Sequence, residues 1–212
     1  MLRPNNKAKQ FENMQDILTY LSGLTQGFYG AFWERVDEVR CEDHNIMYTS
    51  TTGTDKDITQ HIDLMYQYGK GGRVYTSDTK GPRKTITKDK YCDDIPLEFT
   101  NRNGDRGSLF GDQDFMNQYV VDDNGRFWLY QFNRKQLAEW AMMNVSSTNG
   151  HYYTLRSVGG GKLMWAPLAD ITAPRAEVSY SKYDVDDYVM QVYQEVQQKG
   201  LHCLDRLNPI GK

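Results

Sequence analysis

Two strand-like segments joined by a glycine-rich turn constrain this 212-residue chain more than any other feature. The segments run from 57 to 66 and from 73 to 81, with Gly69-Lys70-Gly71-Gly72 between them. Folding about the middle of that turn pairs residues whose numbers sum to 141, which places Asp63 opposite Asp78. Opposed residues on antiparallel strands have Cβ atoms about 4.5–5.5 Å apart, so we expect the two carboxylates to meet. A one-residue bulge would instead turn one of them to the other face.

An ammonium group joins these carboxylates in the predicted hairpin. Side chains alternate along a strand, so Asp78 and Lys80 share one face. Two carboxylates held close together repel each other, and one takes up a proton unless a divalent cation is bound. Oxygen-only ligands favour Mg²⁺ or Mn²⁺. The hairpin therefore predicts a metal site formed by Asp63 and Asp78 beside Lys80.

These motifs resemble those of the PD-(D/E)XK nuclease superfamily, the fold of many restriction enzymes, Holliday-junction resolvases and phage recombination nucleases. The segment 61–64, His-Ile-Asp-Leu, resembles the first acidic motif, and 76–81, Thr-Ser-Asp-Thr-Lys-Gly, resembles the second. Ile62 replaces the proline of the family name, and Asp78 replaces the more frequent glutamate. The resemblance covers roughly 57–98, with a weaker continuation to about 140. Within the superfamily, the motifs of this chain are similar to those of phage-associated or Holliday-junction-resolvase-like members.

The resemblance implies an α+β sandwich fold with a restriction-endonuclease-like core. Its mixed central sheet would be flanked by helices, with extra hairpins and a helix added at the C-terminus. We expect one nuclease-like domain over 1–212, with a core at about 28–143 and an extension at about 150–212. The length and the 39% hydrophobic content agree with one enzyme-sized domain.

The resemblance also implies roles for individual residues. Asp63 and Asp78 would bind Mg²⁺ or Mn²⁺, with the carbonyl of Thr79 as a further oxygen ligand. Lys80 would position or deprotonate the attacking water and steady the phosphate. The expected activity is hydrolysis of phosphodiester bonds in DNA by a metal-dependent endonuclease.

Auxiliary acids are common in the family, and this chain offers three candidates. Glu34 and Glu38 lie one helical turn apart in a predicted helix, so the sequence does not choose between them. Glu98 lies on a later predicted strand, where Leu97 and Phe99 point the opposite way. It is either an auxiliary ligand or a surface residue.

Positive charge is concentrated after the hairpin turn. The net charge is −3, yet 70–90 contains seven basic and two acidic residues. Lys and Arg contacts to the phosphate backbone release condensed counterions. We therefore expect nucleic-acid contacts from Arg83 and Lys84, and from Lys70 and Arg73, although such a stretch is also typical of a solvated loop.

Composition favours a reducing, cytoplasmic location. No run reaches the roughly 18 apolar residues of a membrane span, and the first residues lack the apolar core of a signal peptide. Cys41, Cys92 and Cys203 are an odd number at wide spacing, which indicates neither a disulfide framework nor a zinc site.

The remaining patterns predict further elements. Asn124-Gly125 indicates a type I′ hairpin turn, and Asn133 with Gln136 indicates a helix start. His61 would lie opposite Lys80 and either touch substrate or make a structural hydrogen bond. The predicted helices are 11–22, 28–40, 134–143 and 184–199, and the further strands are 95–100, 116–121, 126–132, 151–157 and 162–168.

Two other functional classes stay open at this stage. The fold could have lost catalysis and act as a DNA- or protein-binding module. It could also be an unrelated α+β interaction protein with a coincidental Asp-x-Lys, which is decided by whether Asp63, Asp78 and Lys80 converge. The sequence leaves open DNA or RNA, sequence- or structure-specific cleavage, and monomer or homodimer.

Overall fold

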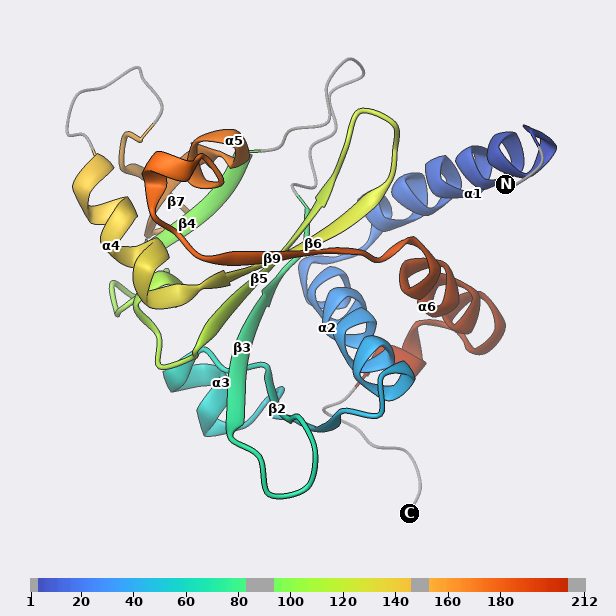
Figure 1. Ribbon diagram of the computed structural model, residues 1–212, viewed down its shortest axis with the longest axis horizontal. Coiled ribbons are helices and arrows are strands. Elements are labelled where there is room, and N and C mark those ends of the chain that lie inside the picture. The colour runs from blue at the N-terminus through green and yellow to red at the C-terminus, as the bar shows by residue number, and fades with distance from the viewer. Residues whose placement is uncertain (1–3, 83–93, 146–152, 206–212) are drawn as a thin grey trace.

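A mixed six-stranded sheet lies at the centre of the computed structural model, which describes residues 4–82, 94–145 and 153–205 (Figure 1). The sheet has the order β1-β2-β3-β5-β6-β9, in which β3 and β5 are parallel and the other neighbours are antiparallel. A second sheet has the order β4-β8-β7. The strands are β1 Met47–Ser50, β2 Leu64–Gln67, β3 Val74–Lys80, β4 Asp94–Thr100, β5 Phe115–Val121, β6 Phe127–Asn133, β7 Arg156–Val158, β8 Gly161–Pro167 and β9 Tyr180–Asp184.

Helices lie on both sides of the central sheet. None of the described helices is long and apolar enough to cross a membrane. The α-helices are α1 Pro4–Gly23, α2 Gln26–Asp43, α3 Asp55–Gln60, α4 Arg134–Asn144, α5 Leu168–Ile171 and α6 Asp186–Lys199, with 3₁₀ helices at Ser108–Phe110, Pro174–Ala176 and Leu201–Leu204.

The two faces of the central sheet belong to different hydrophobic clusters. One face packs on α1, α2 and α6, where Trp33 and Tyr119 are buried. The other packs on the second sheet and α4, where Met116 and Phe132 are buried. Figure 1 shows the helices α1, α2 and α6 on one side and β4, α4 and α5 on the other. The predicted α+β class with a mixed central sheet and flanking helices is confirmed.

The predicted strand 57–66 is wrong in its first half, because 55–60 form helix α3. Thr54 is the N-cap residue, and the carboxylate of Asp57 accepts a hydrogen bond from the N–H of Gly53 at 2.7 Å. Asp55 and Asp57 also place negative charge in the first turn, where the helix dipole favours it. The Thr54 side chain makes no capping bond to this helix, so the acidic first turn and the bond from Gly53 to Asp57 stabilise its start.

The predicted hairpin register is confirmed over four pairs, from Leu64–Ser77 to Gln67–Val74. It stops before the acidic motif, however. The N–H of Asp63 donates to the carbonyl of Ser77 at 2.9 Å. Ser77 is already the register partner of Leu64. The regular ladder therefore does not place Asp63 directly opposite Asp78.

The hairpin between β5 and β6 differs from the predicted type I′ turn. Of its loop residues, only Gly125 has a positive φ, at 76°, whereas a type I′ turn needs two. The N–H of Gly125 donates to the carbonyl of Asp122 at 2.8 Å, and Asp122 also bonds Arg126. This is a three-residue loop, in which glycine supplies the left-handed position.

The other predicted elements are largely confirmed. α1, α2 and α4 cover three predicted helices, and α6 begins two residues after the predicted start of the fourth, because β9 ends at Asp184. The Asn133 side chain accepts from the N–H of Gln136 at 3.1 Å. The predicted strand 95–100 is β4, which pairs with β8 in the second sheet. The last predicted hairpin is β7 and β8, although 151–152 lie outside the described residues.

Gly81, directly after β3, is packed against the aromatic rings of α2. A Cβ atom at this position would lie 2.7 Å from Cε1 of Tyr29 and would also clash with the buried ring of Trp33. We expect Gly81→Ala to lower the free energy of unfolding by about 1–3 kcal/mol, the usual effect of overpacking. Urea denaturation measures this. Gly27→Ala is the control, because nothing lies within 4 Å of the added methyl group.

Candidate functional site

The second acidic motif lies at the end of β3 and forms a partly buried charge pair. The Nζ of Lys80 donates to Oδ1 of Asp78 at 2.7 Å. Asp78 is only 2% exposed, whereas the side chain of Lys80 is 32% exposed. Among the described residues, Oδ2 of Asp78 has no hydrogen-bond partner although it is buried. Asp78 therefore has one satisfied and one unsatisfied carboxylate oxygen.

Asp63 reaches the same site by a route other than the predicted one. It lies just before β2, and its Oδ2 accepts a hydrogen bond from the N–H of Thr79 at 2.6 Å. Burial raises its pKa well above the ordinary value, and the negative charges of Asp78 and Glu34 raise it further; Lys80 and the Thr79 N–H oppose this. The metal-free site therefore favours a proton on Asp63.

Lys80 stays positively charged in this setting. Burial lowers its pKa, but the negative charges of Asp78 and Asp63 raise the pKa by more, and the charge of Glu98 raises it further. The net result is a pKa above the ordinary value. The structure thus brings Asp63, Asp78 and Lys80 together, as the sequence predicted.

Glu34 is the acid of α2 that acts on this site. Its Oε2 accepts from the hydroxyl of Thr52 at 2.6 Å, and its charge contributes to the raised pKa of Asp63. Glu38 instead forms an ion pair with Arg35 at 3.0 Å. Of the two acids between which the sequence did not choose, Glu34 is the one whose charge contributes to the raised pKa of Asp63.

Glu98 approaches the site from the second sheet. Its Oε2 accepts from the N–H of Ser108 at 3.1 Å, at the start of the 3₁₀ helix that follows β4. Its charge contributes to the raised pKa of Lys80. Glu98 is therefore half-buried, bonded to the backbone of Ser108, and within electrostatic reach of Lys80.

A buried carboxylate that the sequence analysis missed supports the site from behind. Asp37 is completely buried on α2, and its Oδ2 accepts from the hydroxyl of Thr79 at 2.6 Å. Thr79 thereby links Asp37 to Asp63, to which it donates its N–H. The available signal was the spacing, since Asp37 lies four residues after Trp33 on the buried face of the helix.

The two predicted nucleic-acid contacts near the hairpin turn, Lys70 and Arg73, differ in how closely their side chains approach this site. Lys70 is exposed in the turn, and Arg73 pairs with Asp114 at 2.8 Å. The backbone of both residues lies at the opposite end of β3 from Lys80, roughly 20 Å away at the usual rise per residue. The side chain of Arg73, however, reaches back along the strand to Asp114, which also bonds Thr76. The other two predicted contacts, Arg83 and Lys84, lie outside the described residues.

His61 does not lie opposite Lys80, so that prediction is wrong. It ends α3 with a left-handed backbone, φ 54°, and its Nε2 lies 3.0 Å from the carbonyl of Arg106. The structure contains the hydrogen bond that was the alternative. Cys41 and Cys203 are free thiols, and Cys92 lies outside the described residues.

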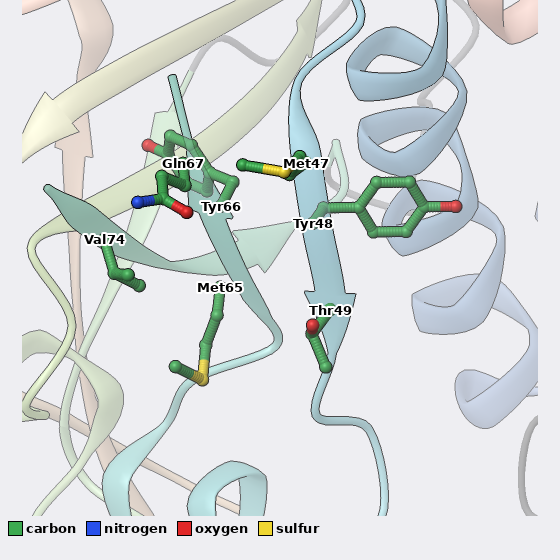
Figure 2. A pocket seen from close by; sticks show the side chains of 7 residues that line it. All are labelled: Met47, Tyr48, Thr49, Met65, Tyr66, Gln67 and Val74. Atoms are coloured by element: carbon green, nitrogen blue, oxygen red, sulfur yellow. The ribbon is translucent and has the colours of Figure 1, made fainter. Parts of the chain in front are cut away.

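A shallow pocket of about 150 Å³ lies elsewhere on the sheet. Figure 2 shows it on β1, β2 and the start of β3, between Met47, Met65, Gln67 and Val74. Val74 is roughly 13 Å along the strand from Asp78. The pocket is therefore separate from the charged cluster.

The site fits a cation with few protein ligands. Within 4–82, 94–145 and 153–205, no three His, Cys, Asp or Glu side chains form a ready-made metal site. Mg²⁺, however, keeps several waters and is commonly held by one or two carboxylates together with substrate phosphates. The unsatisfied Oδ2 of Asp78 and the carboxyl of Asp63 suit such a cation.

Comparisons with known proteins do not assign this chain to a family. No family model, curated protein or solved structure matches the chain.

The raised pKa of Asp63 predicts a pH-dependent stability. Because its pKa is higher in the folded than in the unfolded protein, its stabilising contribution is complete below the unfolded value, about 3.9, and is lost as pH rises through the folded value. Asp63→Asn keeps a neutral acceptor for Thr79. We therefore expect the Tm of Asp63→Asn in EDTA to exceed the wild-type Tm by an amount that grows as pH rises. Each kcal/mol of difference in the free energy of unfolding shifts Tm by about 2–4 °C.

Thermal unfolding from pH 4 to pH 9 measures this difference. Asp123→Asn, whose side chain is exposed in the β5–β6 loop, sets the baseline. A difference between Asp63→Asn and wild type that does not change with pH would contradict the assignment of the buried charge to Asp63.

Proposed function

We propose that this chain is a metal-dependent nuclease that hydrolyses phosphodiester bonds in DNA. The observation that carries the proposal is that the two carboxylate oxygens of Asp78 differ. Oδ1 is bonded to Lys80, whereas Oδ2 is buried without a hydrogen-bond partner among the described residues. Next to it, Asp63 has a raised pKa because of burial and the charge of Asp78. The carboxylates that act on this cluster outnumber the ammonium group of Lys80, and a divalent cation would balance the excess negative charge.

The residues that would hold the cation are Asp63 and Asp78, with the carbonyl of Thr79 as a further oxygen. Glu34 would contribute from α2, because its charge already acts on Asp63. A bound Mg²⁺ or Mn²⁺ would lower the pKa of its water and neutralise charge that develops on the phosphate.

The charge state of Lys80 favours one of its two expected roles. Its raised pKa favours the ammonium form, which supports positioning of the water over its deprotonation. With 32% of its side chain exposed, it can contact a substrate oxygen. Lys80 would thus orient the attacking water and stabilise the negative charge of the phosphate.

The architecture agrees with the family that the motifs resemble. β3 carries Asp78 and Lys80 in the interior of a mixed sheet with helices on its faces. A restriction-endonuclease-like core is therefore part of the proposal. Action in the cytoplasm, and a homodimer for cutting both strands, belong to the same proposal.

Cleavage of duplex, branched and single-stranded DNA with Mg²⁺ or Mn²⁺ tests the proposal. We expect Asp78→Asn and Lys80→Ala each to lower the cleavage rate about 10²–10³-fold, as is typical for removing one group that stabilises the transition state. Lys199→Ala is the matched control, because Lys199 also donates to a carboxylate, at 3.0 Å, but on α6.

The outcomes separate the proposed activity from its alternative. Cleavage that persists at the wild-type rate in both variants would place the chemistry elsewhere. Binding of DNA without cleavage, unchanged by either substitution, would favour a binding module.

Metal binding can be measured without any cleavage. We expect Mg²⁺ or Mn²⁺ to raise the wild-type Tm, because a ligand at 100 times its Kd stabilises the folded state by about 2.7 kcal/mol. Asp78→Asn should abolish the rise, whereas Asp112→Asn, at an exposed position, should retain it. An equal rise in Asp78→Asn would show that the cation binds at another site.

A further inference from the structure

Three arginines from distant parts of the sequence meet around one short segment, 111–114. One precedes β3, one lies in the 101–114 loop, and one is the first residue of α4. We call them the arginine cluster: Arg73, Arg106 and Arg134.

Each member holds the segment with one nitrogen. Nη2 of Arg73 bonds Oδ1 of Asp114 at 2.8 Å, and Nε of Arg134 bonds the carbonyl of Gln113 at 3.2 Å. Nη2 of Arg106 bonds Oδ1 of Asp112 and a backbone carbonyl, both at 3.2 Å. Within the described residues, the other guanidinium nitrogens of the cluster make no hydrogen bond.

The cluster is exposed and has more positive than negative charge. The side chains of Arg73 and Arg106 are 68% and 60% exposed. Three guanidinium groups face two carboxylates, those of Asp112 and Asp114. Arg134 is partly buried, which lowers its pKa, and the like charge of Arg106 lowers it further. The excess positive charge is suited to an anion.

The cluster lies beside the candidate active site. Oδ2 of Asp114 accepts from the N–H and the hydroxyl of Thr76, at 3.1 and 3.3 Å. Thr76 points to the same face of β3 as Asp78, roughly 7 Å along the strand. On the other side, the carbonyl of Arg106 contacts His61, two residues before Asp63.

We propose that the arginine cluster binds backbone phosphates of the DNA next to the bond that is cut; this rests on the proposed nuclease function. Guanidinium groups form paired hydrogen bonds with phosphate oxygens, and the positive end of the α4 dipole adds to the attraction at Arg134. In the free protein, the carboxylate of Asp112 is paired with the guanidinium of Arg106. A DNA phosphate would displace that exposed carboxylate.

The salt dependence of DNA binding in EDTA tests this. For a short duplex, log Kd rises linearly with the logarithm of the salt concentration, with a slope of about 0.9 for each phosphate contact. We expect Arg106→Gln and Arg134→Gln each to reduce that slope by about one contact and weaken binding roughly tenfold. Lys199→Gln is the control: its side chain is also 60% exposed and ion-paired, but it lies on α6, on the opposite face of the sheet.

Asp112→Asn separates phosphate binding from loop support. If the Arg106–Asp112 pair only holds the loop, Arg106→Gln and Asp112→Asn should both lower Tm and weaken binding. We expect instead that Asp112→Asn tightens DNA binding several-fold, because it frees Arg106 and removes a negative charge. Circular dichroism of each variant verifies the fold.

The results also separate this inference from the proposed function. Metal-dependent cleavage with unchanged slopes in both arginine variants would overturn the inference alone. Slopes that depend on the arginines, without cleavage under any metal, would overturn the nuclease activity and leave the phosphate-binding surface. A wild-type protein that does not bind duplex DNA would overturn the inference.

Discussion

The buried carboxylate of Asp37 is the interaction on which the centre of the structure depends. Burying a charged group is costly unless it is paired and hydrogen-bonded. Asp37 accepts hydrogen bonds from Thr79, Asn117 and Tyr119 at 2.6–2.9 Å, and the guanidinium of Arg40 lies 3.7 Å away. Because these donors come from β3 and β5, one carboxylate fixes α2 against the parallel strand pair.

This arrangement also determines the geometry of the candidate site. Thr79 uses its hydroxyl for Asp37 and its N–H for Asp63, so the buried network and the site share one residue. Glu34 lies one turn before Asp37 on the same helix. Fixing α2 at Asp37 therefore also sets where Glu34 stands relative to Asp63.

The parts of this site that could be predicted from sequence are those set by local chemistry. The glycine-rich turn fixed the β2–β3 register, and alternation placed Asp78 and Lys80 on one face. The position of Asp63 could not be derived in the same way, because the capped helix α3 replaces the strand before it.

Long-range contacts were beyond such reasoning. Asp37 meets Thr79 and Asn117, partners 42 and 80 residues away, and the arginine cluster brings Arg73 to Asp114, 41 residues away. Only the packing of α2, the sheet and the 101–114 loop brings these groups together.

The parallel pairing of β3 and β5 has a consequence for how such a protein can change. Parallel neighbours require the chain to return along the sheet between them. Here that return includes β4 and the 101–114 loop, and thus Glu98 and Arg106. The residues proposed for chemistry belong mainly to the sheet, whereas Arg106 belongs to the connection. Substitutions around Arg106 in that connection can therefore change the phosphate contacts proposed for the arginine cluster without altering Asp63, Asp78 or Lys80.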